Sequence, residues 1–414
     1  MAIASLVEFN SSPSSAPSAI TAEVPPSGTY DITSAPGYML VGGQNGSWGE
    51  PGQYPALYKV DLTNGTPAVS LLTVGGEGTV WSGGYNGTTW LISGWGSGKY
   101  LDPYITLYDG TLSGKVHLSD YSQIGMEEQE WNGGDIFSVG WNGTSWLLTG
   151  MGSGVLPPDD SIDNHMSIAT LSANGVFTDL STQIPHQGDM ILYANAWNGK
   201  YWLVGGGWYG WPAGKLFIMS GDKITDMTGE IAAAVPTFNS IQSISWNGQY
   251  FLIGGVGFLA EYDGHTFTDL TGELNAALGT SHVLSWTTDN GVNAIAWNGQ
   301  YWMLAGGTPV ADYAGIGDYS AWVASIQPAS GGAGLQGALY TDLTTTVIPG
   351  YVQENESNST ILTMACWSGA GCAIGGADSA GGLLMWYNGV NTTDLSSVVY
   401  SSISYIQWIG LPDS

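Results

Sequence analysis

Short apolar runs alternate with Asn-Gly and Asp-Gly pairs along most of the chain. The clearest case is the stretch 246–255, where Trp-Asn-Gly separates one apolar run from a second run that ends in Gly-Gly. Asn-Gly between two apolar runs is a strong hairpin signal, because a type I′ turn needs positive φ at both central residues. The pattern therefore predicts a β-hairpin with a tight type I′ turn, whose second strand is stopped by Gly-Gly.

This hairpin pattern recurs along the chain, with copies roughly 50 to 70 residues apart. Seven copies are recognisable, and the other six begin at Ala35, Tyr85, Trp141, Trp197, Trp297 and Trp367. A period of this length is typical of a propeller or a solenoid, in which each unit buries its faces only against its neighbours.

A second pattern follows each hairpin. After the copy at 246–255 comes an apolar run that ends in Asp263-Gly264, and then an alternating run that ends in Asp-Leu-Thr. Asp-Leu/Met-Ser/Thr occurs at Asp179, Asp226, Asp269, Asp342 and Asp394. A ring of carboxylates is one interpretation of these aspartates, but a repeated turn or cap bond to the backbone is the simpler one. Each unit then consists of four short strands, which predicts an all-β fold with a single seven-bladed propeller of four-stranded blades.

The unit resembles the kelch repeat. Its order is a strand, a turn, a strand closed by Gly-Gly, a strand ending in Tyr-Asp, and a short last strand, as in 246–270. Phe177 and Phe267 stand where kelch repeats usually carry Trp. The resemblance covers about residues 30–400 and implies the propeller architecture, while it says little about function.

The domain limits follow from the repeat. Residues 1–29, rich in Ser and Pro, are predicted to be an N-terminal arm or linker, and residues 30–414 the propeller. The arm could pair with a blade of its own ring or with another subunit. We expect the ring to close by pairing of the chain ends, with 403–410 beside 38–41, although 30–33 is an alternative source of the same strand.

Charge narrows the range of functions. The formal net charge is −28, the basic residues are six lysines, and there is no arginine. We therefore do not expect the protein to bind nucleic acid by neutralising phosphates. We also do not expect a sialidase, because that activity would need a cluster of arginines for the substrate carboxylate. Only 10% of residues are charged, which suits either a protein from an acid habitat or a neutral secreted protein kept soluble by its negative charge.

The composition indicates an outside location. No apolar run is long enough for a transmembrane helix, so membrane insertion is not expected. The start of the chain does not have the form of a standard signal peptide. Eight Asn-x-Ser/Thr sequons suggest a glycoprotein (Asn10, Asn45, Asn64, Asn86, Asn142, Asn355, Asn358 and Asn391). Three of them, Asn64, Asn86 and Asn142, are also Asn-Gly turns of the repeat. We therefore expect an extracellular protein or a virion surface component.

The longest insertions are predicted on one face of the ring, the face formed by the loops after the second and fourth strands. Function concentrates on loops held by a rigid scaffold. Trp208, Tyr209 and Trp211 lie in one such insertion and Trp131 in another. Aromatic faces stack on sugars and anchor protein interfaces. These four residues are the candidate binding residues, for a protein or a glycan on a surface.

Metal and catalytic sites have weaker signals. Asp159, Asp160 and Asp163 have oxygen ligands at spacings that Ca²⁺ could use, but the EF-hand pattern of Gly and a closing Glu is missing, and a solvated acidic loop is the simpler interpretation. The five histidines are scattered, and no zinc spacing occurs. A non-catalytic protein is therefore favoured. The alternative is a secreted glycan-active enzyme, a hydrolase or lyase, with acids among Glu127, Glu128, Glu130 and Asp135.

The two cysteines, Cys366 and Cys372, flank the turn of the seventh hairpin. A three-residue loop would place them opposite each other, at a distance that a disulfide can span, whereas a two- or four-residue loop would offset them. The sequence leaves both arrangements open.

Overall fold

The computed structural model describes the parts of the chain that carry the repeat. These are residues 38–45, 54–61, 68–72, 78–96, 103–108, 112–115, 134–156, 161–184, 190–208, 213–285, 290–307, 321–329, 334–348, 363–367, 371–378, 381–398 and 403–409. The predicted arm, residues 1–29, and the alternative strand at 30–33 lie outside these ranges.

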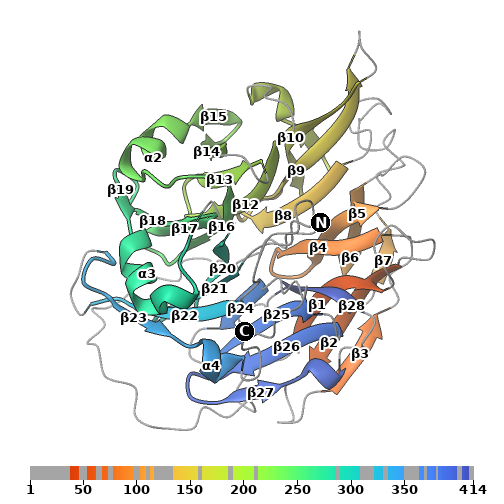
Figure 1. The fold of residues 1–414 in the computed structure, drawn as a ribbon. Coiled ribbons are helices and arrows are strands. Elements are labelled where there is room, and N and C mark those ends of the chain that lie inside the picture. Colours follow the sequence, from red (N-terminus) through yellow and green to blue (C-terminus); the bar gives the residue numbers. More distant parts are fainter. Residues whose placement is uncertain are drawn as a thin grey trace.

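The protein is an all-β propeller of seven four-stranded antiparallel sheets arranged in a ring (Figure 1). Each sheet is one blade, and its strands are given below from the inner strand to the outer strand. Blade one contains β28 (Ile403–Ile409), β1 (Tyr38–Asn45), β2 (Tyr54–Asp61) and β3 (Ala68–Leu72). Blade two contains β4 (Gly78–Tyr85), β5 (Trp90–Gly96), β6 (Pro103–Tyr108) and β7 (Leu112–Lys115), and blade three contains β8 (Gly134–Trp141), β9 (Ser145–Leu156), β10 (Ser161–Ser172) and β11 (Phe177–Asp179).

The remaining four blades repeat this order. Blade four contains β12 (Ile191–Trp197), β13 (Trp202–Gly207), β14 (Gly214–Ser220) and β15 (Lys223–Asp226), and blade five contains β16 (Ile241–Trp246), β17 (Phe251–Gly255), β18 (Phe258–Tyr262) and β19 (Phe267–Asp269). Blade six contains β20 (Gly291–Trp297), β21 (Trp302–Gly307), β22 (Trp322–Gln327) and β23 (Leu339–Asp342), and blade seven contains β24 (Thr363–Trp367), β25 (Gly371–Asp378), β26 (Gly381–Tyr387) and β27 (Thr392–Asp394).

Helical segments in the described residues are short. They are η3 (Ser181–Gln183), α2 (Thr228–Ala234), α3 (Thr271–Leu278), η4 (Gly279–Ser281), α4 (Thr344–Val347) and η5 (Ser396–Val398). All lie in connections from the outer strand of one blade to the next blade. In the described part of the chain, no helix has the length and apolar character needed to cross a membrane.

The ring closes as predicted. β28 pairs antiparallel with β1, with Leu40 opposite Ile409 and Gly43 opposite Ile406. The C-terminal strand is thus the inner strand of blade one, and the rest of that blade comes from the start of the described chain. This pairing covers an edge of β1 that would otherwise present unpaired backbone groups.

The hairpin turns differ from the type I′ prediction. Trp246 pairs with Phe251, so the loop contains four residues instead of two. Asn247 Oδ1 accepts the N–H groups of Gln249 and Tyr250, both at 2.9 Å, and Gly248 has φ of 94°. The same side-chain bonds occur at Asn86, Asn142, Asn198, Asn298 and Asn388. The Asn therefore holds a wider loop through its side chain, with the Gly supplying the positive φ.

The Asp-Leu-Thr corners confirm the turn interpretation. In blade five, Asp269 Oδ1 accepts the Thr271 N–H at 2.9 Å, and Thr271 Oγ1 accepts the Leu259 N–H at 3.1 Å. The Leu270 N–H donates to the Leu259 carbonyl at 2.9 Å. Equivalent sets occur at Asp179, Asp226, Asp342 and Asp394. Each aspartate therefore holds the corner in shape, and the Ser or Thr hydroxyl two residues later fastens the corner to the neighbouring strand.

The aromatic residues of the repeat pack within and between blades. In blades two to six, the paired aromatic residues that flank the loop contact each other across the hairpin with tilted rings, as Trp297 and Trp302 do with ring centroids 5.1 Å apart. Trp302 is fully buried, and its ring centroid lies 6.2 Å from that of Tyr250 in the preceding blade. Burying such side chains between blades is worth about 1.5–3 kcal/mol each relative to exposure, which explains why a chain with few charges forms a stable ring.

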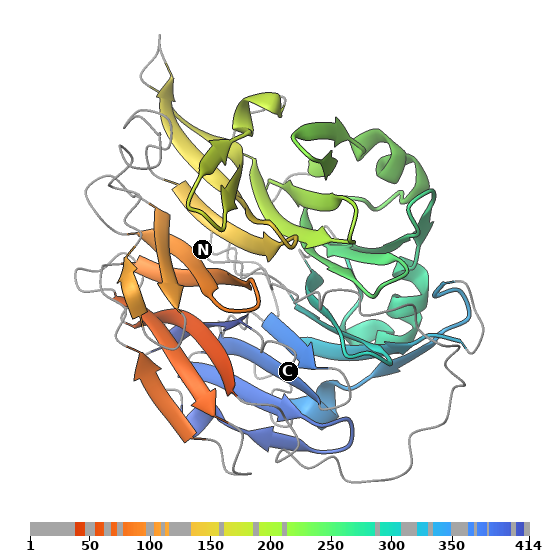
Figure 2. The ribbon, with the colours of Figure 1, turned by 180° about the vertical axis from the view of Figure 1, so that it is seen from behind.

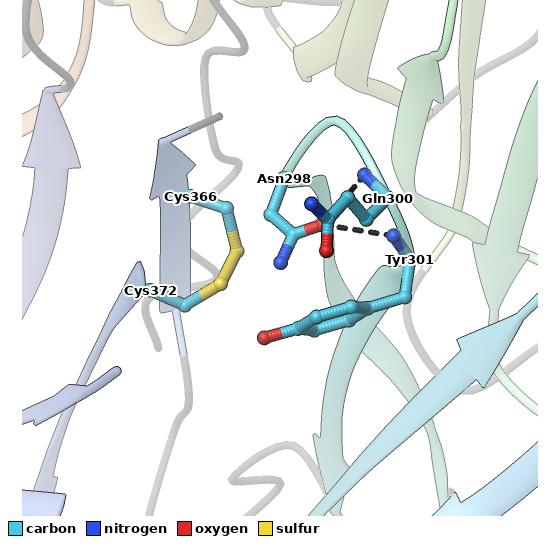
Figure 3. The surroundings of a disulfide bond; sticks show 5 residues. All are labelled: Asn298, Gln300, Tyr301, Cys366 and Cys372. Atoms are coloured by element: carbon cyan, nitrogen blue, oxygen red, sulfur yellow. Dashed lines mark hydrogen bonds between the residues drawn. A yellow bond between two sulfur atoms is a disulfide. The ribbon is translucent and has the colours of Figure 1, made fainter. Parts of the chain in front are cut away.

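Cys366 and Cys372 form a disulfide across the first hairpin of blade seven (Figure 3). Trp367 pairs with Gly371, so the loop has three residues and places the two cysteines directly opposite each other, with Cα atoms 4.0 Å apart. Figure 3 shows the disulfide facing the blade-six loop that carries Tyr301, and Tyr301 belongs to the same packed cluster as Cys366. The three-residue alternative is therefore the correct one.

Glu261 joins blade five to blade six through a buried contact. This β18 residue is 6% exposed, and its Oε2 accepts the N–H of Leu335 at 2.7 Å, in the connection from β22 to β23. The chain runs so close that a Cβ on Gly334 would lie 2.5 Å from Oε1. Burial raises the pKa of the Glu261 carboxyl above its ordinary value, and the Leu335 N–H offsets only part of this.

We expect Glu261→Gln to change how the stability of the protein depends on pH. Since the folded-state pKa lies above the unfolded value of about 4.3, the native protein binds the proton more tightly, and its stability rises as pH falls through the raised pKa. This gain in the free energy of unfolding is complete once the pH is below the unfolded-state pKa. The variant, which has no proton to bind there, should be more stable than the parent at pH 7, and this advantage should shrink by pH 4. Urea unfolding at both values measures the difference, and a constant difference would contradict the prediction.

Candidate binding face

Five successive inner strands carry a β-bulge near their first residues. The pairing shifts between Val80 and Ser82 in β4, and equivalent shifts occur in β8, β12, β16 and β20. The additional residues are Trp81, Phe137, Tyr193, Gln242 and Asn293, and all five are buried. We call these five residues the inner row. Bulges redirect side chains and are common beside functional sites.

The first three members of the inner row are aromatic and contact one another in sequence. The ring centroids of Trp81 and Phe137 are 5.6 Å apart, and those of Phe137 and Tyr193 are 5.3 Å apart. Each bulge residue therefore meets its counterpart in the next blade. The row extends around the inner side of the ring, where β4, β8 and β12 lie next to one another (Figure 1).

Gln242 and Asn293 are the bulge residues of blades five and six, and these two blades are related to each other as blades two and three are. Ser82, directly after Trp81, accepts the Val139 N–H at 2.9 Å. Ser243, directly after Gln242, accepts the Ile295 N–H at 3.1 Å. Val139 and Ile295 each follow their own bulge residue by two positions, so the two blade pairs are equivalent. Gln242 and Asn293 thus occupy the same positions on the neighbouring strands β16 and β20 as Trp81 and Phe137 do on β4 and β8.

These two amides are not fully hydrogen-bonded. Gln242 is 0% exposed, and its Nε2 donates to Ser240 Oγ at 2.9 Å while its Oε1 has no partner within the described protein. Asn293 is 1% exposed, and neither its Oδ1 nor its Nδ2 has a partner there. Buried polar side-chain atoms are hydrogen-bonded in most proteins, so this part of the inner row requires an explanation.

Trp208 lies at the same end of blade four. It directly follows β13, whose last residue Gly207 pairs with Ile191, two positions before Tyr193. Its side chain is 37% exposed. The predicted binding residue Trp208 is thus at the surface, at the same end of blade four as the inner-row residue Tyr193.

The other predicted binding residues cannot be placed next to Trp208. Tyr209, Trp211 and Trp131 lie outside the described residues. Whether they join Trp208 in one patch therefore stays a prediction.

The predicted metal ligands, like the predicted binding residues, lie only partly within the described residues. Asp159 and Asp160 lie outside the described residues, between β9 and β10. These two strands, each of 12 residues, form a long hairpin that extends beyond the rim in both ribbon views (Figure 2). Asp163 is a residue of β10, paired with Gly154. The described residues contain no group of three metal-ligating side chains, and the Ca²⁺ hypothesis stays untested.

The candidate acids of the enzyme alternative are not brought together in the described structure. Glu127, Glu128 and Glu130 lie outside it, and Asp135 is described as a residue of β8, paired with Met151. The inner row itself contains aromatic and amide side chains, so it offers stacking and hydrogen bonding. It supplies no carboxylate pair for acid–base catalysis.

The inner row was not predicted from the sequence. One signal was present: counted back from the residue before each Asn-Gly, the fourth residue is Trp81, Phe137, Tyr193, Gln242 or Asn293. Aromatic and amide residues at one repeat position contrast with the small residue, Ser or Ala, that directly follows each of them. Without the register, however, nothing marks this position as a bulge.

The known structures that resemble this chain do so only distantly. No family model and no curated protein matches the chain. A solved structure of a putative 6-phosphogluconolactonase from Bacteroides uniformis is 10% identical, with a TM-score of 0.48, over 90% of this chain and 99% of that one. The β-propeller domain of the Trilobed protease from Pyrococcus furiosus is 11% identical, with a TM-score of 0.43, over 87% and 97% of the two chains.

Proposed function

We propose that this propeller is a non-catalytic recognition or assembly protein displayed outside the cell or on a virion, in an organism of acid habitat. The observation that carries the proposal is the end of blade four, where an exposed tryptophan adjoins a row of uncharged aromatic and amide side chains. Such side chains suit the binding of a protein or a glycan. The kelch-like repeat supplies the rigid ring, and the face with the longer loops supplies the contacts.

Two further features support the location. The Cys366–Cys372 disulfide is typical of proteins that fold in, or are released into, an oxidising environment. The low density of charged residues and the raised pKa of Glu261 both suit folding in acid, where carboxyl groups are neutral. Neither feature names a partner. Assembly through the N-terminal arm and glycosylation of the sequons belong to the same proposal.

Replacing Trp208 with alanine should weaken attachment or assembly by ~2 kcal/mol or more, about thirtyfold in affinity, the scale of an interface hot spot. The side chain is 37% exposed, so the ring should keep its unfolding midpoint. The measurement is binding of the purified protein to the cells or particles of its source and to an immobilised glycan panel.

Leu339→Ala is the matched control for this experiment. Leu339 is also a large apolar residue at the surface, 63% exposed, but it lies on the outer strand of blade six. This variant should bind like the parent. Normal binding by Trp208→Ala, or equal losses in the two variants, would show that the working face has been assigned wrongly.

A further inference from the structure

We propose that Gln242 and Asn293 form a subsite for an uncharged, hydroxyl-bearing ligand, a carbohydrate, at the inner row between blades five and six. The inference rests on the proposed recognition function and specifies its ligand. It is carried by the unpartnered amide atoms, which lie where the repeat brings two successive bulge residues together.

The number of unsatisfied atoms is the first argument. Gln242 Oε1, Asn293 Oδ1 and Asn293 Nδ2 all have no partner within the described protein, and both residues are at most 1% exposed. Leaving a buried donor or acceptor without a partner destabilises the folded protein by the cost of removing that group from water. Leucine or methionine would fill the same volume without this cost. Amides at both positions are therefore better explained by a bound polar group than by packing.

The chemistry of the ligand follows from the atoms. Two carbonyl oxygens accept hydrogen bonds and one amide nitrogen donates, so the bound group must both donate and accept. A hydroxyl does this with a single oxygen, and a sugar presents several hydroxyls in a row. The inner row contains no charged side chain that would favour an ion.

The neighbouring members of the row supply the other half of such a site. Tyr193 precedes Gln242 in the row, and it contacts Phe137, which contacts Trp81. Aromatic faces pack against the C–H surface of sugar rings, while amides bind the hydroxyls. The change from aromatic to amide side chains at one repeat position thus matches a ligand that has both kinds of surface.

The test uses glucose, galactose, mannose and N-acetylglucosamine as probes, with glucuronate as the charged comparison. Titration calorimetry on the full chain should show saturable binding of at least one neutral sugar, in preference to glucuronate. Asn293→Leu, which keeps the shape of the side chain, should lose about tenfold or more in affinity. Gln242→Met should lose affinity in the same direction, whereas Leu339→Ala should not. Asn293→Leu should be at least as stable as the parent, because it removes two polar atoms that are unpaired without ligand, whereas Gln242→Met also removes the hydrogen bond to Ser240.

Three results would overturn the subsite: no binding of any neutral sugar, unchanged affinity in Asn293→Leu, or a preference for glucuronate. A crystal structure with a sugar soaked in distinguishes a ligand from ordered water, and water alone bonded to both amides would also overturn it. If the subsite fails while Trp208→Ala still lowers attachment, the proposed recognition function stands. If Trp208→Ala has no effect, that function fails independently of the sugar result.

Discussion

Ending the chain after Ser402 should open the ring and abolish its cooperative unfolding. The truncation removes β28, the inner strand of blade one, and with it the backbone ladder between 403–409 and β1. β1 would then expose an unpaired edge toward the ring centre, and blade one would lose the part of its packing against blade seven that β28 makes with β25 and β26. We expect a loss of about 5 kcal/mol or more, comparable with the whole stability of many domains.

Urea unfolding followed by tryptophan fluorescence measures this effect. The matched control ends after Gly410, which keeps β28 complete and removes only the four residues that follow it. The control should unfold at the same midpoint as the full chain. An equal midpoint for the chain that ends at Ser402 would mean that β28 is dispensable and that the ring is held closed by the other blades.

The fold could be predicted from the sequence because the same structural unit is repeated seven times along the chain. Two independent patterns, the hairpin and the Asp-Leu-Thr corner, mark the same unit, so errors in one copy are corrected by the others. Closure was predictable because 403–410 reads as a first strand without a partner. The disulfide could not be decided, since it depends on whether the loop between Cys366 and Cys372 has three residues.

The turn type was wrong for a physical reason. Asn-Gly marks a turn, but the register of the hairpin depends on the aromatic residues that flank it. Trp197 pairs with Trp202, and their ring centroids are 5.2 Å apart. Packing of these two side chains across the hairpin places four residues in the loop, and Asn198 Oδ1 then accepts two backbone N–H groups of the loop. Cross-strand packing therefore determined the loop length, in preference to the local propensity of Asn-Gly.

The candidate site was predicted only in part. The exposed residue of the insertion, Trp208, could be recognised because an aromatic residue beside Gly and Pro in a long insertion is unusual. The inner row could not, since its members are ordinary aromatic and amide residues within an apolar strand. Asn293 becomes informative only once its burial and its unpartnered atoms are known.

Gly-Gly does more than end its strand. Strand β17 ends at Gly255, as the sequence predicted, and both glycines also have close neighbours in the ring. A Cβ on Gly254 would lie 2.6 Å from Val292 of the next blade, and a Cβ on Gly255 would lie 2.1 Å from the carbonyl oxygen of Ser240. The first glycine lets two blades approach each other, and the second lies opposite the bulge that holds Gln242.

Gly255→Ala should therefore destabilise the protein by about 3 kcal/mol or more, because the added methyl group overlaps a backbone oxygen that cannot rotate away. Gly272→Ala is the matched control: Gly272 lies in α3, and a Cβ there meets no atom within 4 Å. The control should gain up to about 1 kcal/mol, as alanine does in a helix. Urea unfolding of both variants measures the contrast. If Gly255→Ala were as stable as the parent, the bulge would be free to shift, and the inner row would lose the rigid backbone on which its proposed role depends.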